Sequence, residues 1–273
     1  MLTSLQNPLV KQIKKLHDSK HRRQTQCFLL EGTHLLQEAA SAQWPLETLC
    51  YTEAWQAKEP SLLERLKLLA PRAELVSDGV LAAMTTTVSP DGVMAIARSI
   101  PQSSAPIEGL PIEGLGLVLD GLQDPGNVGT ILRTAAAAGV ERVLLSGESV
   151  DLENPKVLRA SSGAWFRVSA VRCENLLETV QGYRNQGFQV VATTPKADLD
   201  YWSVDYTQPT ILLVGNEGAG LSEALLAAAS IEVRIPLSAS IESLNAAIAT
   251  ALVLFEVKRQ RSVQGEKRQG EKR

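Results

Sequence analysis

The sequence contains few of the residues that build disulfide frameworks or metal centres. Its 273 residues include three cysteines, which are widely spaced and form no CxxC pattern: Cys27, Cys50 and Cys173. This odd, scattered set argues against a disulfide framework and a zinc site, so we expect no bound metal. No apolar run is long enough to span a bilayer and the N-terminus has no signal-peptide core, so we expect a cytoplasmic protein without membrane association.

Histidine is scarce, and the familiar glycine fingerprints are incomplete. All three histidines lie within residues 1–34, which argues against a Ser-His-Asp triad or a histidine-based metal centre in the rest of the chain. Gly126 and Gly129 lack the third glycine of a dinucleotide fingerprint, and residues 215–220 carry their glycines in the order GxxGxG. No lysine follows either cluster as a P-loop requires, so both common nucleotide-binding motifs fail.

Positive charge is not in excess over the whole chain, but it gathers at the two ends. The net charge is −3, yet residues 1–23 hold one acid, Asp18, against six basic residues: Lys11, Lys14, Lys15, Lys20, Arg22 and Arg23. An apolar stripe accompanies them: Leu5, Leu9, Ile13 and Leu16. This pattern favours a docked helix with a basic outer face over a solvated charge run. Residues 263–273 have no apolar residue after Val263, so we expect a disordered basic tail.

The chain divides at a stretch rich in proline and glycine. Residues 100–116, "IPQSSAPIEGLPIEGLG", contain three prolines and three glycines without any periodicity, which is typical of a linker. We therefore expect a small α/β domain over 1–100, a linker over 101–114 and a larger domain over 115–262. In the larger domain, apolar strands alternate regularly with helical patterns, which predicts a mainly parallel sheet with helices on both faces.

Three loops of the larger domain are dense in small and polar residues. They are "DGLQDPGNVGTILR" (120–133), "VGNEGAGLSE" (214–223) and "IPLSASIESLN" (235–245), and each follows an apolar strand. Because ligands of such sheets bind at the carboxyl ends of the strands, we expect the three loops to form one composite site. Its poverty in acid–base side chains suits a reaction whose difficult chemistry resides in a cofactor, such as methyl transfer from a sulfonium.

These loops resemble the signature motifs of the SpoU/TrmH-type branch of the SPOUT superfamily, the knotted RNA 2′-O-ribose methyltransferases. The motifs stand here as "DPGNVGTILRTAAAAG", "LLVGNEGAGLS" and "IPLSASIESLNAAIATALVLFE", with the intervening pattern "NPKVLRASSGAWFR". The N-terminal "TSLQNPLVKQIKKL" and "FLLEGTHLLQEA" look like the substrate-binding domain of this family. The resemblance covers residues 1 to about 262, and three motifs in this order are highly specific.

The resemblance implies a C-terminal trefoil knot that binds S-adenosylmethionine. By motif, the cofactor-binding positions are Thr193, Leu213, Gly215, Ile235 and Leu244. The catalytic positions are Asn127, Arg133, Glu217, Ser243 and Asn245. The expected RNA-binding residues of the basic helix are Lys11, Lys14, Lys15, Arg22 and Arg23. The family also implies a homodimer through the last helix, which we expect over Ser243 to about Arg261.

The roles of two catalytic candidates are argued from their chemistry. A guanidinium loses its proton only above about pH 12, so Arg133 suits an RNA phosphate better than the role of general base. The alternative for Arg133 is a surface ion pair. Ser243 stands where a helix N-cap belongs, and a purely capping role is its alternative. The sequence departs from the family at Ala239, where glycine is common and where a side chain would narrow the cofactor loop, and at Ser169, where proline is common.

We expect an RNA (ribose-2′-O-)-methyltransferase that acts on structured RNA, with large-subunit ribosomal RNA as the first candidate. A transfer-RNA 2′-O-methyltransferase is the alternative within the same chemistry. A non-catalytic RNA-binding or ribosome assembly factor would keep the fold without binding the cofactor. A nucleotide-dependent oxidoreductase is a third hypothesis, which the missing dinucleotide fingerprint disfavours. The sequence does not define the methylated nucleotide.

Overall fold

The structure, a computed structural model, describes residues 1–100, 114–239 and 241–270, with the side chains of 265–270 left out. The chain forms two compact units. The first unit combines residues 1–101 with residues 151–166, and the second combines 102–150 with 167–273. The predicted linker, 101–114, lies outside the described residues except for Gly114. None of the described helices is long and apolar enough to cross a membrane.

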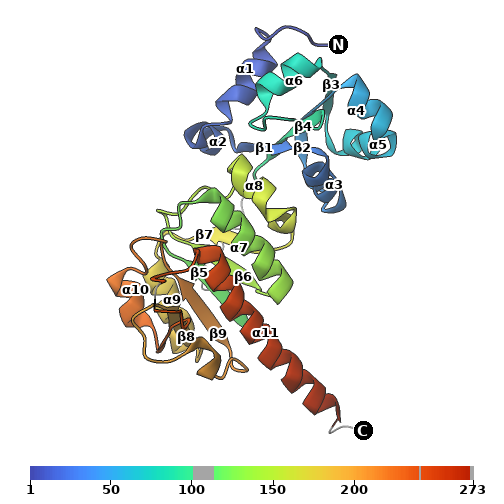
Figure 1. The fold of residues 1–273 in the computed structure, drawn as a ribbon. Coiled ribbons are helices and arrows are strands. Elements are labelled where there is room, and N and C mark those ends of the chain that lie inside the picture. The colour runs from blue at the N-terminus through green and yellow to red at the C-terminus, as the bar shows by residue number, and fades with distance from the viewer. Residues whose placement is uncertain (101–113, 240, 271–273) are drawn as a thin grey trace. The chain divides into compact units, whose positions relative to one another are not determined.

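The first unit is built around a four-stranded mixed sheet. Its strands, in spatial order, are β1 (Cys27–Glu31), β4 (Val93–Arg98), β2 (Leu46–Tyr51) and β3 (Arg72–Leu75). Only the β2–β3 pair among these neighbours is parallel. The helices of the unit are α1 (Pro8–Lys15), α2 (Ser19–Thr25), α3 (Thr33–Ser41), α4 (Glu53–Lys58), α5 (Pro60–Leu69), α6 (Asp78–Met84) and α8 (Pro155–Ser161). Helices α1 and α6 cover one face of the sheet, and α3 and α5 cover the other (Figure 1).

Helix α1 forms the basic, docked helix that the sequence predicts, with one change. Asn7 caps it by accepting from the Leu9 N–H at 2.9 Å, and Pro8 occupies the first turn. Leu9 and Ile13 are buried, whereas Leu5 precedes the helix and is 50% exposed. The predicted apolar stripe is confirmed for Leu9, Ile13 and Leu16 but not for Leu5. Leu5 lies outside the helix, so the helical spacing does not place it on the buried face.

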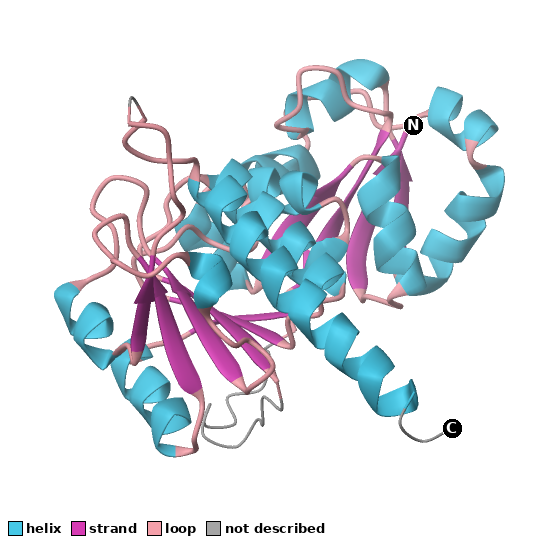
Figure 2. Ribbon diagram, turned by 60° about the horizontal axis from the view of Figure 1, so that its bottom comes forward, coloured by secondary structure: helices cyan, strands magenta, loops and turns pink. Residues whose placement is uncertain are grey.

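The second unit contains a six-stranded sheet in which every neighbouring pair is parallel. Its strands, in spatial order, are β10 (Ile231–Val233), β8 (Gln189–Thr193), β9 (Thr210–Val214), β5 (Leu115–Leu119), β6 (Arg142–Leu145) and β7 (Ser169–Arg172). The helices are α7 (Pro125–Ala138), α9 (Leu176–Asn185), α10 (Glu223–Ala228) and α11 (Ala246–Gly270). Helices α9 and α10 pack on one face, with α7 and α11 on the other (Figure 2). The predicted α/β fold with a mainly parallel sheet is confirmed.

The strand order places a topological switch point between β5 and β9. From β5 the chain proceeds to β6 and β7 on one side, and it then crosses over to β8 and β9 on the other side of β5. Because successive connections diverge from these two strands, their carboxyl ends border an open crevice where parallel sheets bind ligands. The loops that leave β5 and β9 are two of the three loops that the sequence analysis selected.

The connection between β6 and β7 departs from the usual crossover. Residues 151–166, which include α8 and the 3₁₀ helix η2 (Ala164–Phe166), pack within the first unit. The ring of Trp165 lies 5.2 Å from Phe28 and 5.0 Å from Trp44, between ring centroids. Phe166 lies 5.6 Å from Trp44. Such tilted and edge-to-face contacts bury large apolar areas, so this connection supplies part of the first unit's core.

The disordered tail predicted over 263–273 is wrong for residues 263–270, because α11 continues to Gly270. The physical reason lies in the composition of this stretch. Glutamine, glutamate, lysine and arginine have high helix propensities, and extending an existing helix needs no new nucleation. Residues 271–273 lie outside the described part of the chain.

Candidate active site

Three of the predicted catalytic side chains are joined by hydrogen bonds at the switch point. The Asn245 Nδ2 donates to Asn127 Oδ1 at 2.9 Å, and the Asn127 Nδ2 donates to Glu217 Oε1 at 2.7 Å. We call this series Asn245–Asn127–Glu217 the amide chain. Its members come from the start of α11, the start of α7 and the loop after β9. Residues 118 and 90 positions apart in the sequence thus meet in one place.

The first turn of α7 holds Asn127. The Asp124 carboxylate caps the helix by accepting from the Asn127 N–H at 2.8 Å, and Pro125 stands at the first helical position. Gly139 ends the helix in the left-handed conformation, with φ of 84°. Asp124 was not among the predicted site residues, although an acid directly before a proline is a recognisable start signal for a helix.

Asn245 rather than Ser243 caps α11. The Asn245 Oδ1 accepts from the N–H groups of Ala247 at 2.9 Å and Ile248 at 3.3 Å, so its carbonyl oxygen anchors the helix. Its amide nitrogen remains free for Asn127. The alternative of a capping role for Ser243 is therefore wrong, because the helix begins at Ala246 and Ser243 lies before it, exposed. No hydrogen bond of the Ser243 hydroxyl is found within the described residues.

Glycine is required where the loop after β9 folds back on itself. A Cβ added to Gly215 would overlap backbone atoms of Gly220 and Leu221. Gly220 itself has φ of 74°, a conformation that favours glycine. The two glycines therefore let the loop turn tightly and leave Glu217 exposed beside α7. This close backbone approach is the physical reason for the glycine cluster in "VGNEGAG".

The predicted cofactor positions follow three neighbouring strands. Thr193 ends β8, and its hydroxyl donates to the Leu213 carbonyl in β9 at 3.0 Å. Leu213 is fully buried, and Gly215 follows the same strand. Ile235 and Leu244 are half-buried in the connection between β10 and α11. The structure thus brings Thr193, Leu213 and Gly215 together, while no contact that it records joins Ile235 or Leu244 to them.

Arg133 projects from α7 outside the amide chain. It is exposed, and within the described part of the chain its guanidinium makes neither a hydrogen bond nor an ion pair. The alternative of a surface ion pair therefore has no support among the described residues. An uncommitted guanidinium presents a rigid fork of donors that matches a phosphate.

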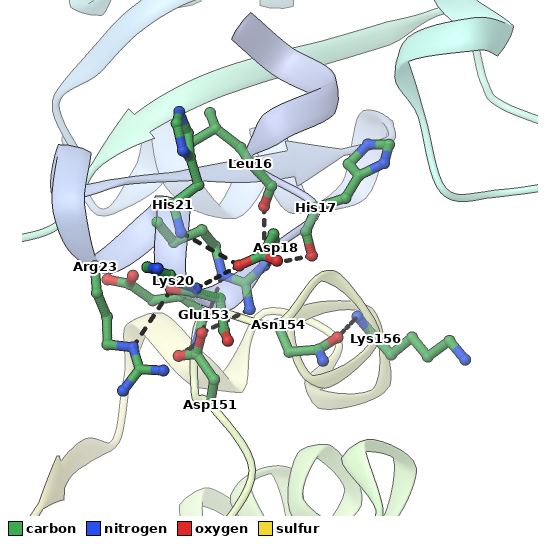
Figure 3. A network of polar contacts seen from close by, with 12 residues as sticks. Leu16, His17, Asp18, Lys20, His21, Arg23, Asp151, Glu153, Asn154 and Lys156 are labelled. Atoms are coloured by element: carbon green, nitrogen blue, oxygen red, sulfur yellow. Dashed lines mark hydrogen bonds and ion pairs between the residues drawn. The ribbon is translucent and has the colours of Figure 1, made fainter.

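One of the predicted RNA-binding residues is wrong, because Arg22 is buried and fully engaged. Its side chain is 2% exposed, and its Nη2 lies 2.6 Å from the Asp151 carboxylate. Its Nη1 donates to the carbonyls of Leu16 and His17 at 2.9 Å each. Figure 3 shows Asp151 and these two carbonyl oxygens gathered in one network. The other predicted RNA-binding residues are exposed: Lys11, Lys14, Lys15 and Arg23.

Two of the three buried cysteines have unreactive thiols. Burial raises the pKa of Cys50 to about 12, with the nearby carboxylate of Glu74 adding to the effect. Burial likewise raises the pKa of Cys27 to about 12, assisted by its hydrogen bond to Glu47. Neither thiol is a nucleophile at neutral pH, because the thiolate is the reactive form. No group of histidine, cysteine, aspartate and glutamate in the described ranges could hold a metal ion.

The fold and this site define an α/β protein that binds a ligand at the switch point of a parallel sheet. Comparison with known proteins gives the family. The profile of the SpoU rRNA Methylase family matches residues 114–255, and the profile of the MRM3-like substrate binding domain matches residues 7–95. The chain therefore belongs to the SpoU rRNA methylase family.

Individual relatives resemble the chain over nearly its full length. An uncharacterized tRNA/rRNA methyltransferase of Synechocystis is 44% identical, over 95% of this chain and 93% of the relative. The 23S rRNA (guanosine(2553)-2′-O)-methyltransferase RlmP of Bacillus subtilis is 33% identical, and the match covers 94% of this chain and 98% of the relative. The crystal structure of an AdoMet-bound rRNA methyltransferase from Sinorhizobium meliloti has a TM-score of 0.83 and 36% identity. The match covers 94% of this chain and 97% of that chain.

Proposed function

We propose that this protein transfers a methyl group from S-adenosylmethionine to a ribose 2′-hydroxyl of large-subunit ribosomal RNA. The observation that carries the proposal is the amide chain, which assembles three motif residues at the ligand-binding edge of the sheet. The Bacillus subtilis relative, which is similar over nearly the whole chain, is named for 2′-O-methylation of 23S rRNA. The same similarity favours catalysis over a purely binding role.

The residues at the switch point fit the cofactor. Gly215 lets the backbone of Gly220 and Leu221 approach closely and so shapes a tight loop at the end of β9, and the backbone groups of such a loop suit the adenine and ribose of a nucleoside. We propose that Gly215, Ile235 and Leu244 hold the cofactor. Thr193 contributes indirectly, since its hydroxyl is already committed to the Leu213 carbonyl. When bound, the cofactor supplies an electrophilic methyl group on a sulfonium.

The amide chain leaves specific atoms available for the ribose. An asparagine amide has two N–H donors, and Asn127 uses one for Glu217 while its oxygen accepts from Asn245. The second N–H of Asn127 is therefore available to the substrate. A carboxylate also has two oxygens, so Glu217 can hold the hydrogen of the ribose hydroxyl on Oε2 while Oε1 stays bound to Asn127. With the cofactor bound, transfer would form the oxygen–methyl bond and break the sulfur–methyl bond, leaving the demethylated thioether, and the hydroxyl proton would pass to Glu217 Oε2.

Arg133 supplies the positive charge of this site. Its exposed guanidinium without a partner among the described residues supports a role as an anchor for an RNA phosphate. It assists by position and charge. Ser243, exposed before α11, is close in sequence to Asn245 and is proposed to contact the substrate.

The first unit is proposed to bind the RNA through the exposed basic residues of α1 and α2. Lys11, Lys14, Lys15 and Arg23 share no ion pair with an acid in the described residues, so their charges are available to phosphates. RNA loops are the expected targets, because their riboses and bases are accessible to a protein.

A C-terminal knot is proposed from the course of the chain. After the edge strand β10 the chain returns to pack α11 against α7, which follows β5. The connection over 234–245 must therefore pass the carboxyl ends of β8 and β9, beside the loop that carries Gly215 and Glu217. This course supports threading of the C-terminal segment through that loop.

A homodimer is proposed through α11. Its apolar residues Ile248, Leu252 and Phe255 are 55%, 39% and 49% exposed and line a groove with Thr130 and Thr134 of α7. An apolar stripe of this kind suits a second copy of the chain. We expect a dimer by sedimentation at micromolar concentration and a monomer for Phe255→Asp. A monomeric wild-type protein would contradict the proposal. We also propose that the protein works in the cytoplasm.

The proposed function is tested with RNA extracted from a strain that lacks this protein. The protein is incubated with this RNA and S-adenosylmethionine labelled in its methyl group, and the product is digested with alkali. Label in an alkali-resistant dinucleotide of the large-subunit RNA is the expected result. Label in transfer RNA would favour that substrate instead. RNA binding without any label would favour an assembly factor, and binding of NADH would favour an oxidoreductase.

A further inference from the structure

The position of Glu217 depends on the loop that carries it. The Glu217 side chain is exposed, and its hydrogen bond with Asn127 crosses from the loop after β9 to the helix after β5. The Glu217 side chain has a fixed length, so its carboxylate reaches Asn127 only while the backbone of the loop lies within that length of α7. Whatever fixes the loop of residues 215–222 against the end of β5 therefore fixes the carboxylate against Asn127.

The side chain of Asn216 makes this connection. Its Nδ2 donates to the Gly121 carbonyl at 2.8 Å, in the loop that follows β5. Its Oδ1 accepts from the N–H groups of Gly218 and Ala219 at 2.9 Å each. The main chain of Asn216 closes the same loop, because it exchanges two hydrogen bonds of 2.9 Å with Gly220. One residue thus shapes the loop around Glu217 and ties it to its neighbour.

The attachment point at Gly121 is itself held in place. Gly121 has φ of 68°, and its N–H donates to the buried hydroxyl of Ser146 at 2.8 Å. Ser146 is 3.1 Å from Ser149, Oγ to Oγ, and both serines are buried in the loop after β6. The far end of the Glu217 loop is held separately, since the Ser222 N–H donates to Asp120 at 2.9 Å. The hydrogen bond from Asn216 therefore ends on a loop that is itself bonded to the buried Ser146.

From these contacts we infer that Asn216 is a positioning residue that sets the Glu217 carboxylate against Asn127 for methyl transfer. The inference rests on the proposed function. One N–H and the oxygen of the Asn216 amide are committed to the two loops, so we assign its effect on the reaction to the placement of its neighbour Glu217. An asparagine suits this position because its amide presents a donor to Gly121 and, on a separate atom, an acceptor to the loop.

Two variants separate the two halves of this role. Asn216→Asp keeps an acceptor for Gly218 and Ala219 but loses the donor to Gly121 and places a charge against its carbonyl. Asn216→Ala loses both. With RNA and S-adenosylmethionine saturating, we expect kcat to fall about 10-fold in Asn216→Asp and about 100-fold in Asn216→Ala, since a displacement near 1 Å can cost about two orders of magnitude. The KM for RNA should change little, because most of the proposed RNA contacts come from the basic residues of α1 and α2.

Asn175→Ala is the matched control. Asn175 also stabilises its local backbone through its side chain, capping α9 by accepting from the Glu178 N–H at 3.2 Å, but it does not touch the site. Its loss should lower the midpoint of thermal unfolding slightly and leave kcat unchanged. A fall in kcat of similar size in this control would attribute the effect of Asn216 to general destabilisation.

A double-mutant cycle with Glu217→Gln decides whether Asn216 acts through Glu217. If it does, Asn216→Ala should have almost no further effect on kcat in the Glu217→Gln background, because residues that act as one unit are not additive. If the falls in kcat caused by Asn216→Ala and Glu217→Gln multiply in the double variant, the inference is overturned. A kcat of Asn216→Asp within twofold of wild type would also overturn it. Methyl transfer by the wild-type protein is the internal reference. If it is absent, the proposed function fails and the inference fails with it; if it is present, the cycle judges the inference alone.

Discussion

The two units each contain a network of polar side chains, and these networks differ in charge and exposure. In the first unit, Arg22 pairs with Asp151 and Arg159 with Glu31, and the Arg22 and Glu31 side chains are only 2% and 1% exposed. In the second unit, the amide chain joins two neutral amides to the exposed carboxylate of Glu217. Buried charges must be fully paired, so the first network is committed to structure. The exposed amide chain keeps free donors and acceptors, which a substrate can use.

The buried network also explains how a connection of the second sheet joins the first unit. Asp151 and Arg159 both lie on the segment 151–166, and their partners Arg22 and Glu31 lie in the N-terminal stretch. Glu31 additionally accepts from the Thr86 N–H and hydroxyl, and Arg159 donates to the same hydroxyl at 2.7 Å. These directional contacts specify how the segment packs, beside the aromatic contacts of Trp165 that supply apolar burial.

Removing one partner of the buried network should have the largest effect on stability. Arg22→Ala strands the Asp151 carboxylate and two backbone carbonyls, so we expect the free energy of unfolding to fall by about 3 kcal/mol. The neighbouring Arg23→Ala is the control, since Arg23 is exposed, and it should change stability by less than about 0.5 kcal/mol. Urea denaturation of both variants measures the difference. Equal stability of the two would show that Arg22 is not structural.

The amide chain should show the opposite behaviour. Asn127→Ala removes the central member, so we expect kcat to fall about 100-fold, the scale of losing one positioned hydrogen-bond donor in a reaction centre. The thermal midpoint should stay close to that of wild type, because the chain is exposed and stores little stability. Single-turnover methyl transfer measures the expected loss of activity, and calorimetry on the same preparation measures the thermal midpoint. If Asn127→Ala both unfolds and loses activity, the amide chain contributes to stability as the buried network does, and the proposed difference between the two is contradicted.

The exposed basic residues of α1 should affect binding rather than catalysis or stability. Lys14→Gln removes one phosphate contact, so the slope of log affinity against log salt concentration should become shallower by about 0.7 for a single-stranded target. Lys58→Gln, on α4 and also exposed, is the control and should leave the slope unchanged. Titrations at several salt concentrations measure both. An unchanged slope for Lys14→Gln would discard this helix as the RNA-binding surface.

The smallest expected effect is a pH dependence of stability in the buried network. Burial raises the pKa of Glu153, which lies beside Asp151 (Figure 3). The native state therefore holds this proton more tightly than the unfolded state, so Glu153 contributes stability at low pH that is lost as pH rises through its raised pKa. Glu153→Gln should stabilise the protein at neutral pH and flatten the change in stability above about pH 4.5, the usual value for glutamate. A steeper pH dependence in the variant would contradict this sign.

Sequence patterns predicted the regular elements well, and failed where the outcome depends on distant partners. The parallel sheet follows from apolar runs that alternate with helical periods. The burial of Arg22 was missed because its partner, Asp151, lies 129 positions away. The capping of α11 was misassigned by two residues, since Ser243 and Asn245 are both good caps and only the three-dimensional start of the helix distinguishes them.

The glycine-rich loop after β9 also shows that sequence patterns do not predict contacts between distant residues. Its composition predicted a ligand site, and the motif selected Glu217. Nothing in the local pattern indicated that the Asn216 side chain binds Gly121, because that contact joins residues 95 positions apart. Topology, which brings the ends of β5 and β9 together, is what converts two separate motifs into one site.

The most direct test of the account is a map of ribose methylation on large-subunit RNA from a strain lacking this protein, after treatment with wild-type protein or Asn127→Ala. The account predicts that wild-type protein and S-adenosylmethionine add one 2′-O-methyl group to an RNA loop. Asn127→Ala, folded and bound to the same RNA with unchanged affinity, should leave that ribose unmodified within the time in which wild type completes the reaction. Full methylation by Asn127→Ala would show that the amide chain does not carry the chemistry.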